Sequence, residues 1–226
     1  MRTFDQIFSI AAGRHGGKAA LERKLEKPKP VTELNKIPDA WWLAGMTRAV
    51  FNPGFNWKVV ESKWSGFEAA LSKFDPNKVA MLSDDDIDRL MQDTRIIRHG
   101  EKIRSVRENA VFLLELKKER GKGDHQLAVW PSTDFVGLLE MLGKRGARLG
   151  GNTGPYFLRS MGRDGFILND DGIGRLIDEK VIDKPPSSKR AMRAVQDAFN
   201  IWMDQSGRSL MEISRVIAMS HGDPYY

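Results

Sequence analysis

The residues best suited to chemistry lie in one glycine-rich stretch, Leu149-Gly-Gly-Asn-Thr-Gly154. Glycine lets backbone N–H groups approach an anion closely, and Arg145 and Arg148 add positive charge just before the stretch. The nucleotide-binding pattern GxxxxGK[ST] is absent, as is a GxGxxG between a strand and a helix. We therefore expect a loop that grips phosphate through its own backbone. Its residues are Gly150, Gly151, Asn152, Thr153 and Gly154.

Two interpretations of this stretch follow from the residues alone. Helices are expected over residues 133–141 and 156–161, so the loop is a hairpin between helices whose N–H groups can bind a DNA phosphate without reading sequence. An acid of the downstream run Phe166-Ile-Leu-Asn-Asp-Asp171 is then expected near the sugar. In the alternative, the glycines only form a tight turn and Asp170 or Asp171 caps the next helix.

Other chemistries find little support in the composition. The chain has no cysteine, which excludes thiol nucleophiles and thiolate metal sites. The four histidines stand alone, without the spacing of a metal-binding helix. The run Asp84-Asp85-Asp86 is interpreted as the start of a helix, where the helix dipole favours negative charge.

Length and composition are those of a globular protein. The 226 residues are 41% hydrophobic and 29% charged, and no apolar run is long enough to span a membrane. The N-terminus is a poor signal peptide, and the absence of cysteine fits the cytoplasm. The formal net charge of +6 favours an anionic partner.

Hydrophobic spacing predicts an all-α protein of many short helices. Apolar residues at helical spacing predict one amphipathic helix over residues 57–74, stopped by Asp75-Pro76. Ser83 with Asp86, and Ser209 with Glu212, are typical of capping boxes that open helices. Alternating strand patterns are few.

The middle of the chain resembles the type I DNA-3-methyladenine glycosylases of the helix-hairpin-helix superfamily. Their G-L-S-W opening, F-D-P-x-K-V-A turn and D-x-x-I-I-R-H-x-x-K-I-x-x-x-x-x-N-A helix pair correspond without gaps to Gly54–Trp57, Phe74–Ala80 and Asp93–Ala110. A second match covers Lys144–Gly146, Asn152-Thr153, Tyr156 and Asn169-Asp170. About 90 residues are covered, and neither terminal segment aligns.

The resemblance implies a glycosylase fold of two helical lobes with a cleft between them. Residues 1–226 form a single glycosylase-like unit, with one lobe from residues 1–50 and 165–226 and a helix-hairpin-helix lobe from residues 51–164. Bifunctional members of the superfamily carry a catalytic lysine at the position of Asn152, so a monofunctional hydrolase is expected. The superfamily's catalytic aspartate corresponds to Asp170.

The resemblance also assigns the remaining site residues. The family's matching tryptophan lines the base pocket, which makes Trp57 the first candidate for a stacking platform, with Phe55, Asn52 and Tyr156 as further lining residues. The DNA contacts expected outside the hairpin loop are Arg145, Arg148, Arg98 and Lys102.

Two departures from the family pattern concern the metal and the pocket. The family carries a structural zinc bound by cysteine and histidine, whereas this chain has no cysteine and has Asp171 at the position of a histidine ligand. We therefore expect no zinc and no other cofactor. The family's pocket glutamate, eight residues before the tryptophan, is Ala49 here.

The expected function is removal of alkylated purine, 3-methyladenine above all, from damaged double-stranded DNA. The protein is expected to be a monomer in the bacterial cytoplasm, associated with the nucleoid and not with a membrane. Two alternatives remain open: a glycosylase for a different lesion, since Ala49 changes the pocket, and a non-catalytic helix-hairpin-helix DNA-binding module.

Overall fold

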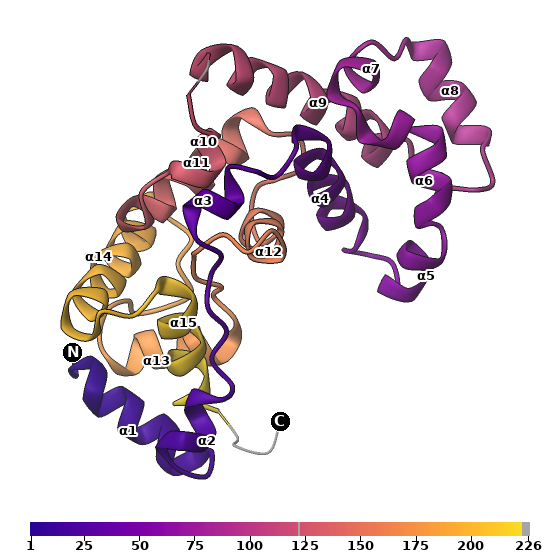
Figure 1. The fold of residues 1–226 in the computed structure, drawn as a ribbon. Helices are drawn as coiled ribbons and strands as arrows, with labels where there is room; N and C mark the ends of the chain where they lie inside the picture. Colours follow the sequence, from indigo (N-terminus) through magenta and orange to yellow (C-terminus); the bar gives the residue numbers. More distant parts are fainter. Residues whose placement is uncertain (122, 223–226) are drawn as a thin grey trace. The chain divides into compact units, whose positions relative to one another are not determined.

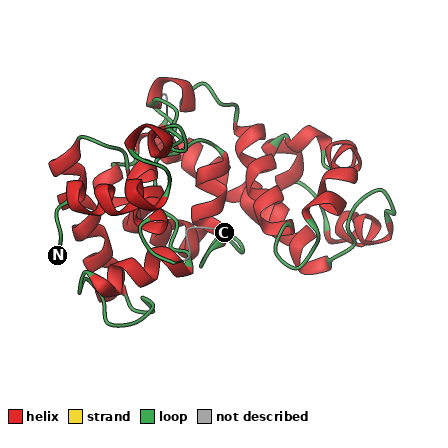
Figure 2. Ribbon diagram, turned by 90° about the horizontal axis from the view of Figure 1, so that it is seen from below, coloured by secondary structure: helices red, strands yellow, loops and turns green. Residues whose placement is uncertain are grey.

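The computed structural model describes residues 1–121 and 123–222. All regular structure in this part of the chain is helical, without a β-strand, as Figure 2 shows. The prediction of an all-α protein is therefore confirmed. None of the described helices is long and apolar enough to cross a bilayer.

The chain folds into two compact units. Unit 1 consists of Met1–Lys29, Pro131–Gly137 and Gly162–Tyr226, and unit 2 of Pro30–Trp130 and Leu138–Met161. These boundaries differ from those of the two lobes that the resemblance implies, mainly because residues 30–50 belong to unit 2. There α4 (Asp39–Phe51) packs against α9 (Gly100–Arg120) and α12 (Thr153–Ser160), which fixes it to that unit.

Unit 1 is organised around α15 (Leu210–Met219), whose residues are mostly buried. It packs against α1 (Phe4–Arg14), α13 (Asp170–Asp178) and α14 (Lys189–Ser206). The helix begins with the predicted capping box, in which Ser209 and Glu212 each bond to the other's backbone N–H. The unit also contains α2 (Lys18–Glu22), which follows α1 in Figure 1, and η2 (Ser132–Asp134).

Unit 2 is organised around α9, the longest helix, which packs against α4, α7 and α8. Its remaining elements, in chain order, are α3 (Val31–Leu34), α5 (Trp57–Ser62), α6 (Trp64–Ala70), η1 (Ser72–Phe74), α7 (Pro76–Ala80), α8 (Asp84–Gln92) and α10 (Gln126–Val129). Helix α11 (Phe135–Arg145) begins in a segment of unit 1 and continues into unit 2, where it leads to α12.

The single helix predicted over residues 57–74 is wrong in its extent. The chain breaks at Lys63, whose φ of −100° and ψ of 3° separate α5 from α6. After α6, Ser72, Lys73 and Phe74 all take positive φ, at 51°, 54° and 60°. Left-handed backbone costs about 1–2 kcal/mol per residue. Burial of the Phe74 ring, stacked 5.2 Å from that of Trp64, offsets part of this cost, which periodicity cannot foresee.

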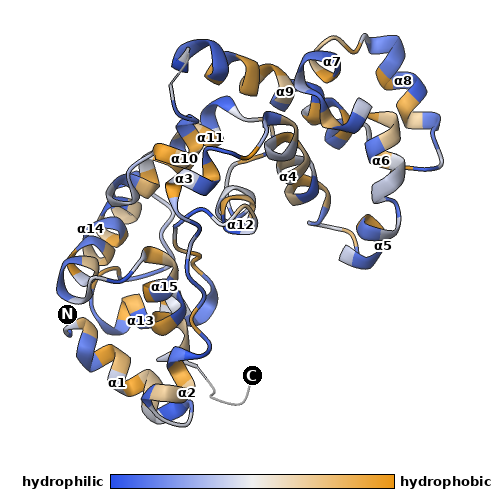
Figure 3. Ribbon diagram, viewed as in Figure 1, coloured by the Kyte–Doolittle hydropathy of each residue, from blue (hydrophilic) through white to orange (hydrophobic). Residues whose placement is uncertain are grey.

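The acidic run opens a helix, as predicted. Ser83 caps α8 by accepting the Asp86 N–H at 3.1 Å, and the Asp86 carboxylate accepts the Ser83 N–H at 2.9 Å. Asp84, Asp85 and Asp86 form the first turn. Polar and apolar residues alternate along this helix in Figure 3, and its buried residues are Ile87 and Leu90.

Candidate functional site

The glycine-rich stretch forms a short hairpin between α11 and α12, and close packing requires one glycine within the stretch and another just before it. A Cβ on Gly154 would meet the Leu149 carbonyl oxygen at 2.7 Å, and one on Gly146 would meet the Leu142 carbonyl oxygen at 2.8 Å. The turn also needs positive φ at Gly151 (58°) and at Arg148 (60°). The tight-turn interpretation therefore explains Gly146, Gly151 and Gly154.

Asn109 of α9 fixes this hairpin from beneath. Its side-chain Nδ2 donates to the Ala147 carbonyl at 3.0 Å, and its Oδ1 accepts the Ala147 N–H at 2.8 Å. The side chain is buried, so both bonds are shielded from water. Asn109 is not among the residues that the sequence predicts for the site. The available signal was an asparagine on the apolar face of a long helix, beside Val106 and Ala110.

The tip of the hairpin leaves donors available. Gly150, Gly151 and Asn152 are exposed, and within the described residues their backbone N–H groups donate no hydrogen bond. Thr153 N–H bonds to the Gly150 carbonyl at 3.3 Å. The hairpin thus presents unpaired N–H groups at the start of α12, where the helix dipole is positive, as the phosphate-binding interpretation requires.

A cavity of about 580 Å³ lies beside the hairpin within unit 2. Its lining residues come from the hairpin, from the end of α4 and from α9: Val50, Pro53, Gly54, Lys102, Arg148, Gly150 and Thr153. Two predicted DNA contacts, Lys102 and Arg148, meet here with two residues of the predicted loop. No acidic residue lines the cavity.

Lys102 is the buried member of this pair, with only 6% of its surface exposed. Its Nζ donates to the carbonyl oxygens of Pro53 at 2.5 Å and Phe51 at 3.5 Å, and lies 4.8 Å from the Phe55 ring centroid. Burial lowers the pKa of the Lys102 ammonium, and the positive charge of Arg148 lowers it further.

The other two predicted DNA-contacting cations differ from this pair. Arg145 is held by α9, at 2.6 Å from Glu119 and 3.3 Å from Glu115, and its hydrogen bonds to these carboxylates raise the pKa of its guanidinium. It would have to leave both partners to reach DNA. Arg98 is exposed and forms no ion pair within residues 1–121 and 123–222.

The predicted base-pocket residues all lie in unit 2, outside the lining of the cavity. Trp57, the first residue of α5, is 64% exposed, and Asn52 and Tyr156 are exposed as well. Phe55 is half-buried between the Lys102 ammonium and the His99 ring, 6.3 Å away. An exposed tryptophan is free to stack on a base. The role of Trp57 stays a prediction.

Asp170 lies in unit 1, as the first and exposed residue of α13. The cap of this helix is Asn169, whose Oδ1 accepts the Gly172 N–H at 3.0 Å, so the alternative that Asp170 or Asp171 caps it is wrong. An exposed carboxylate with no capping bond is free to act on a ligand, and the catalytic role of Asp170 also stays a prediction.

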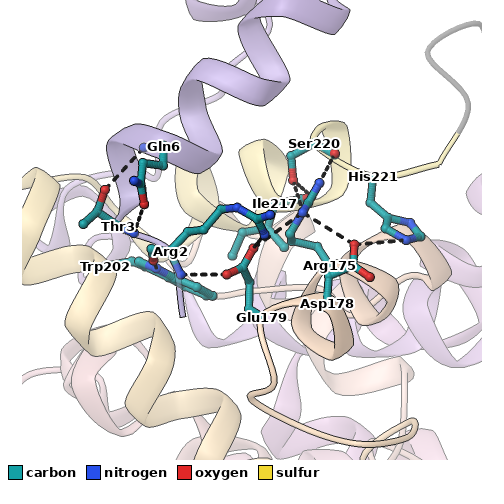
Figure 4. A network of polar contacts seen from close by, with 10 residues as sticks. All are labelled: Arg2, Thr3, Gln6, Arg175, Asp178, Glu179, Trp202, Ile217, Ser220 and His221. Atoms are coloured by element: carbon teal, nitrogen blue, oxygen red, sulfur yellow. Dashed lines mark hydrogen bonds and ion pairs between the residues drawn. The ribbon is translucent and has the colours of Figure 1, made fainter.

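A charge network connects the C-terminal end of α13 with Arg2, near the N-terminus, and with Ser220, which follows α15 (Figure 4). Glu179 accepts the Arg2 backbone N–H and Nη1, each at 2.7 Å. Arg175 lies 3.5 Å from Glu179 and donates through Nε to the Ser220 hydroxyl at 2.8 Å. Burial alone raises the pKa of the Glu179 carboxyl, but the Arg2 hydrogen bonds and the charges of Arg2 and Arg175 hold it below its ordinary value. The network positions the helix that carries Asp170.

The residues around His221 do not fit the zinc ion that the family resemblance implies. Asp171 lies 3.8 Å from the Nδ1 of His221 and Asp178 lies 3.7 Å from its Nε2, but the described part of the chain contains no group of histidine, cysteine and acidic side chains that could hold a metal ion. The guanidinium of Arg175 approaches the same His221-bearing segment through Ser220. A cation site built around a second cation is electrostatically unfavourable.

Comparisons with known proteins agree with the resemblance. The family model described as Methyladenine glycosylase matches residues 44–135, a range that includes Trp57, Lys102 and Asn109. DNA-3-methyladenine glycosylase 1 of Escherichia coli is 29% identical over 165 residues, covering 64% of this chain and 83% of the relative. DNA-3-methyladenine glycosylase of Haemophilus influenzae is 35% identical over 90 residues, covering 40% of this chain and 46% of the relative.

A comparison with solved structures bears on the fold. A crystal structure of a point variant of 3-methyladenine DNA glycosylase I, in complex with 3-methyladenine, matches with a TM-score of 0.51 and 19% identity. The match covers 64% of this chain and 85% of that one. This match confirms the expected glycosylase fold. The resemblance drawn from the sequence is confirmed by the matching family model and the sequence relatives.

Proposed function

We propose, from the similarity of this chain in sequence and fold to the methyladenine glycosylases, that it is a monofunctional DNA glycosylase of base-excision repair. Its substrate is alkylated purine, with 3-methyladenine as the first candidate. The similar proteins are named for this reaction. The observation that carries the proposal within the structure is the hairpin, clamped by Asn109, with unpaired N–H groups and two cations beside it.

The partner is double-stranded DNA that contains a damaged base. Hairpin N–H groups and cations contact the phosphate backbone, which positions the protein without selecting a sequence. Phosphate neutralisation makes such binding salt-dependent. The protein acts as a monomer in this proposal, and its work on chromosomal DNA places it at the bacterial nucleoid.

The base must leave the stack before it can be released, at a cost of a few kcal/mol that is smallest for a damaged base. An N3-alkylated adenine nucleotide carries positive charge, which an exposed indole such as Trp57 attracts through its π-face. Phe55, Asn52 and Tyr156 are proposed as neighbours of the flipped base. Ala49 provides no carboxylate at the family's glutamate position, so shape and stacking carry more of the selectivity here.

Hydrolysis then breaks the bond between the sugar C1′ and the base nitrogen, and the electron pair leaves with the base as neutral 3-methyladenine. Water adds to C1′ and loses its proton. Asp170 is proposed to stabilise the oxocarbenium-like sugar and to orient this water, as a carboxylate does in glycoside hydrolysis. Asn152 has no amine for a Schiff base, so the abasic product is not cleaved further. This proposed hydrolysis involves no cofactor.

The test is release of free base from N-methylated duplex DNA, followed by chromatography. We expect free 3-methyladenine from the wild-type protein and none from Trp57→Ala, with intact strands in both reactions. Release of another lesion from a panel of modified duplexes, but not of 3-methyladenine, would favour the alternative that Ala49 suggests. Salt-dependent binding without any base release would favour a non-catalytic module.

A further inference from the structure

Two cations face one cavity in unit 2 without a carboxylate to balance them. Lys102 and Arg148 both line the cavity beside the hairpin, and neither forms an ion pair within the described part of the chain. Within the described residues, the hydrogen-bond acceptors of Lys102 Nζ are the carbonyl oxygens of Phe51 and Pro53. Carbonyl dipoles solvate an ammonium but supply no negative charge.

Such an arrangement is costly in the absence of a ligand. A buried charge loses its hydration, and a second positive charge nearby adds repulsion. Charges of this kind are retained where a counter-charge arrives from outside the protein. An oxyanion in the cavity would contact both cations and would lie beside Gly150, a lining residue whose backbone N–H donates no hydrogen bond within the described residues.

We propose that this cavity is a phosphate site, in which Lys102 and Arg148 together hold one phosphate group of the bound DNA. The assignment of the phosphate to DNA rests on the proposed glycosylase function. Arg148 reaches the site from the hairpin and Lys102 from α9, so one phosphate is held from two elements that are far apart in sequence.

Lys102 also contacts the segment between α4 and α5, which contains candidate pocket residues. Its Nζ holds the Pro53 carbonyl and lies against the Phe55 ring, between the end of α4 and the start of α5 at Trp57. Arg148 makes no such contact. Lys102 is therefore a positioning residue as well as a phosphate ligand, whereas Arg148 is a phosphate ligand only.

Binding to a duplex that contains a tetrahydrofuran abasic analogue, measured over a range of salt concentrations, tests the site. We expect Lys102→Met and Arg148→Met each to bind roughly tenfold more weakly at fixed salt, and to lower the slope of log K against log salt by about one. Lys102→Arg keeps the charge and the slope. Lys118→Met is the matched control, because Lys118 is an exposed lysine of the same helix.

The positioning role is tested by base release from methylated DNA. We expect Arg148→Met to raise KM with kcat unchanged, and Lys102→Met to raise KM and lower kcat, with kcat restored in Lys102→Arg. Equal kcat in the two methionine variants would contradict the positioning role. Arg148 is exposed, so its variant keeps the test decisive even if Lys102→Met folds poorly.

Inorganic phosphate distinguishes the sources of the anion. We expect phosphate to raise the Tm of the wild-type protein more than that of Lys102→Met. The site would be overturned if both methionine variants fold and keep the wild-type salt slope, and if phosphate raises the Tm of the wild-type protein no more than that of Lys102→Met. Such a result would leave the proposed glycosylase activity untouched. If the wild-type protein binds no duplex, the proposed function and the DNA assignment both fail, and selective stabilisation by phosphate would still support an anion site.

Discussion

Both units bury cationic side chains, but only unit 1 supplies the counter-charge. There Arg175 and Glu179, with side chains 8% and 2% exposed, are joined by Arg2 from the N-terminus. In unit 2, Lys102 is similarly buried, yet within the described residues its ammonium meets carbonyl oxygens, aromatic rings and the charge of a second cation, Arg148, and no carboxylate. The contrast separates two uses of a buried charge. A buried charge that is paired within the protein holds elements together, whereas one left unpaired at a cavity is available to bind a ligand.

The largest loss of stability is expected from a substitution in the paired charge network of unit 1. Glu179→Gln removes the buried carboxylate that Arg175 and Arg2 share and leaves Arg175 with the half-exposed Asp178 alone, so we expect it to lower the free energy of unfolding by about 3–5 kcal/mol. Chemical denaturation followed by circular dichroism measures this change. Arg193→Met, which removes a surface ion pair with Asp134, is the control and should change stability by less than about 1 kcal/mol. Equal effects of the two substitutions would contradict the role given to the network.

The two units should also lose stability at different pH values. In unit 2, burial and the charge of Arg120 lower the pKa of His125 to about 4, despite the opposing charge of Asp39. Below the ordinary pKa of about 6.5 the unfolded chain therefore takes up a proton that the folded chain refuses. We expect unit 2 to lose up to about 3 kcal/mol as the pH falls from 6.5 to 4.

Unit 1 should respond only at lower pH. The pKa of Glu179 lies below its ordinary value of 4.5, so its contribution to stability is present above that pH and is lost as the pH falls through the pKa of the folded state. Hydrogen exchange of α4 and α14 at pH 7 to 4 would follow the two units separately. His125→Asn, which keeps a capping oxygen for α10, should abolish the earlier loss. Simultaneous loss in both units would refute the difference.

A third prediction concerns α13, where a residue proposed to act in catalysis can be distinguished from a residue that stabilises the fold. Asp170 begins α13 and makes no capping bond, whereas Glu179 follows its end within the network. We expect Asp170→Asn to lower the rate of base release roughly hundredfold, about 2.7 kcal/mol, with an unchanged Tm. Single-turnover assays with methylated DNA measure the rate. A rate within a few-fold of wild type would remove Asp170 from the mechanism.

The smallest effect is expected from removing the unpaired cation. Lys102→Met gives up bonds to two carbonyl oxygens but also a buried charge, so we expect the free energy of unfolding to change by less than about 1 kcal/mol without ligand. Denaturation in phosphate-free buffer measures it. A loss as large as that of Glu179→Gln would show that Lys102 is a structural charge, and the contrast between the units would disappear.

Local signals in the sequence were sufficient for several features. The capping boxes at Ser83 and Ser209 and the glycine-dependent turn before Gly154 each depend on residues a few positions apart, and all are present in the structure. The break at Lys63 and the left-handed turn at Ser72–Phe74 were not predictable from periodicity. There tertiary packing of Trp64 and Phe74 overrides the helical preference of the segment.

The sequence by itself determined the all-α class, the hairpin residues and the family resemblance, because helical spacing, turn chemistry and motif order are written along the chain. Only the tertiary structure decided which charges meet. Arg2 and Glu179 are 177 positions apart, and Asn109 and Ala147 are 38 apart. Likewise, Lys102 and Arg148 share a cavity because α9 and the hairpin pack together. The energy of a charge depends on its burial and its neighbours, and no local pattern specifies either one.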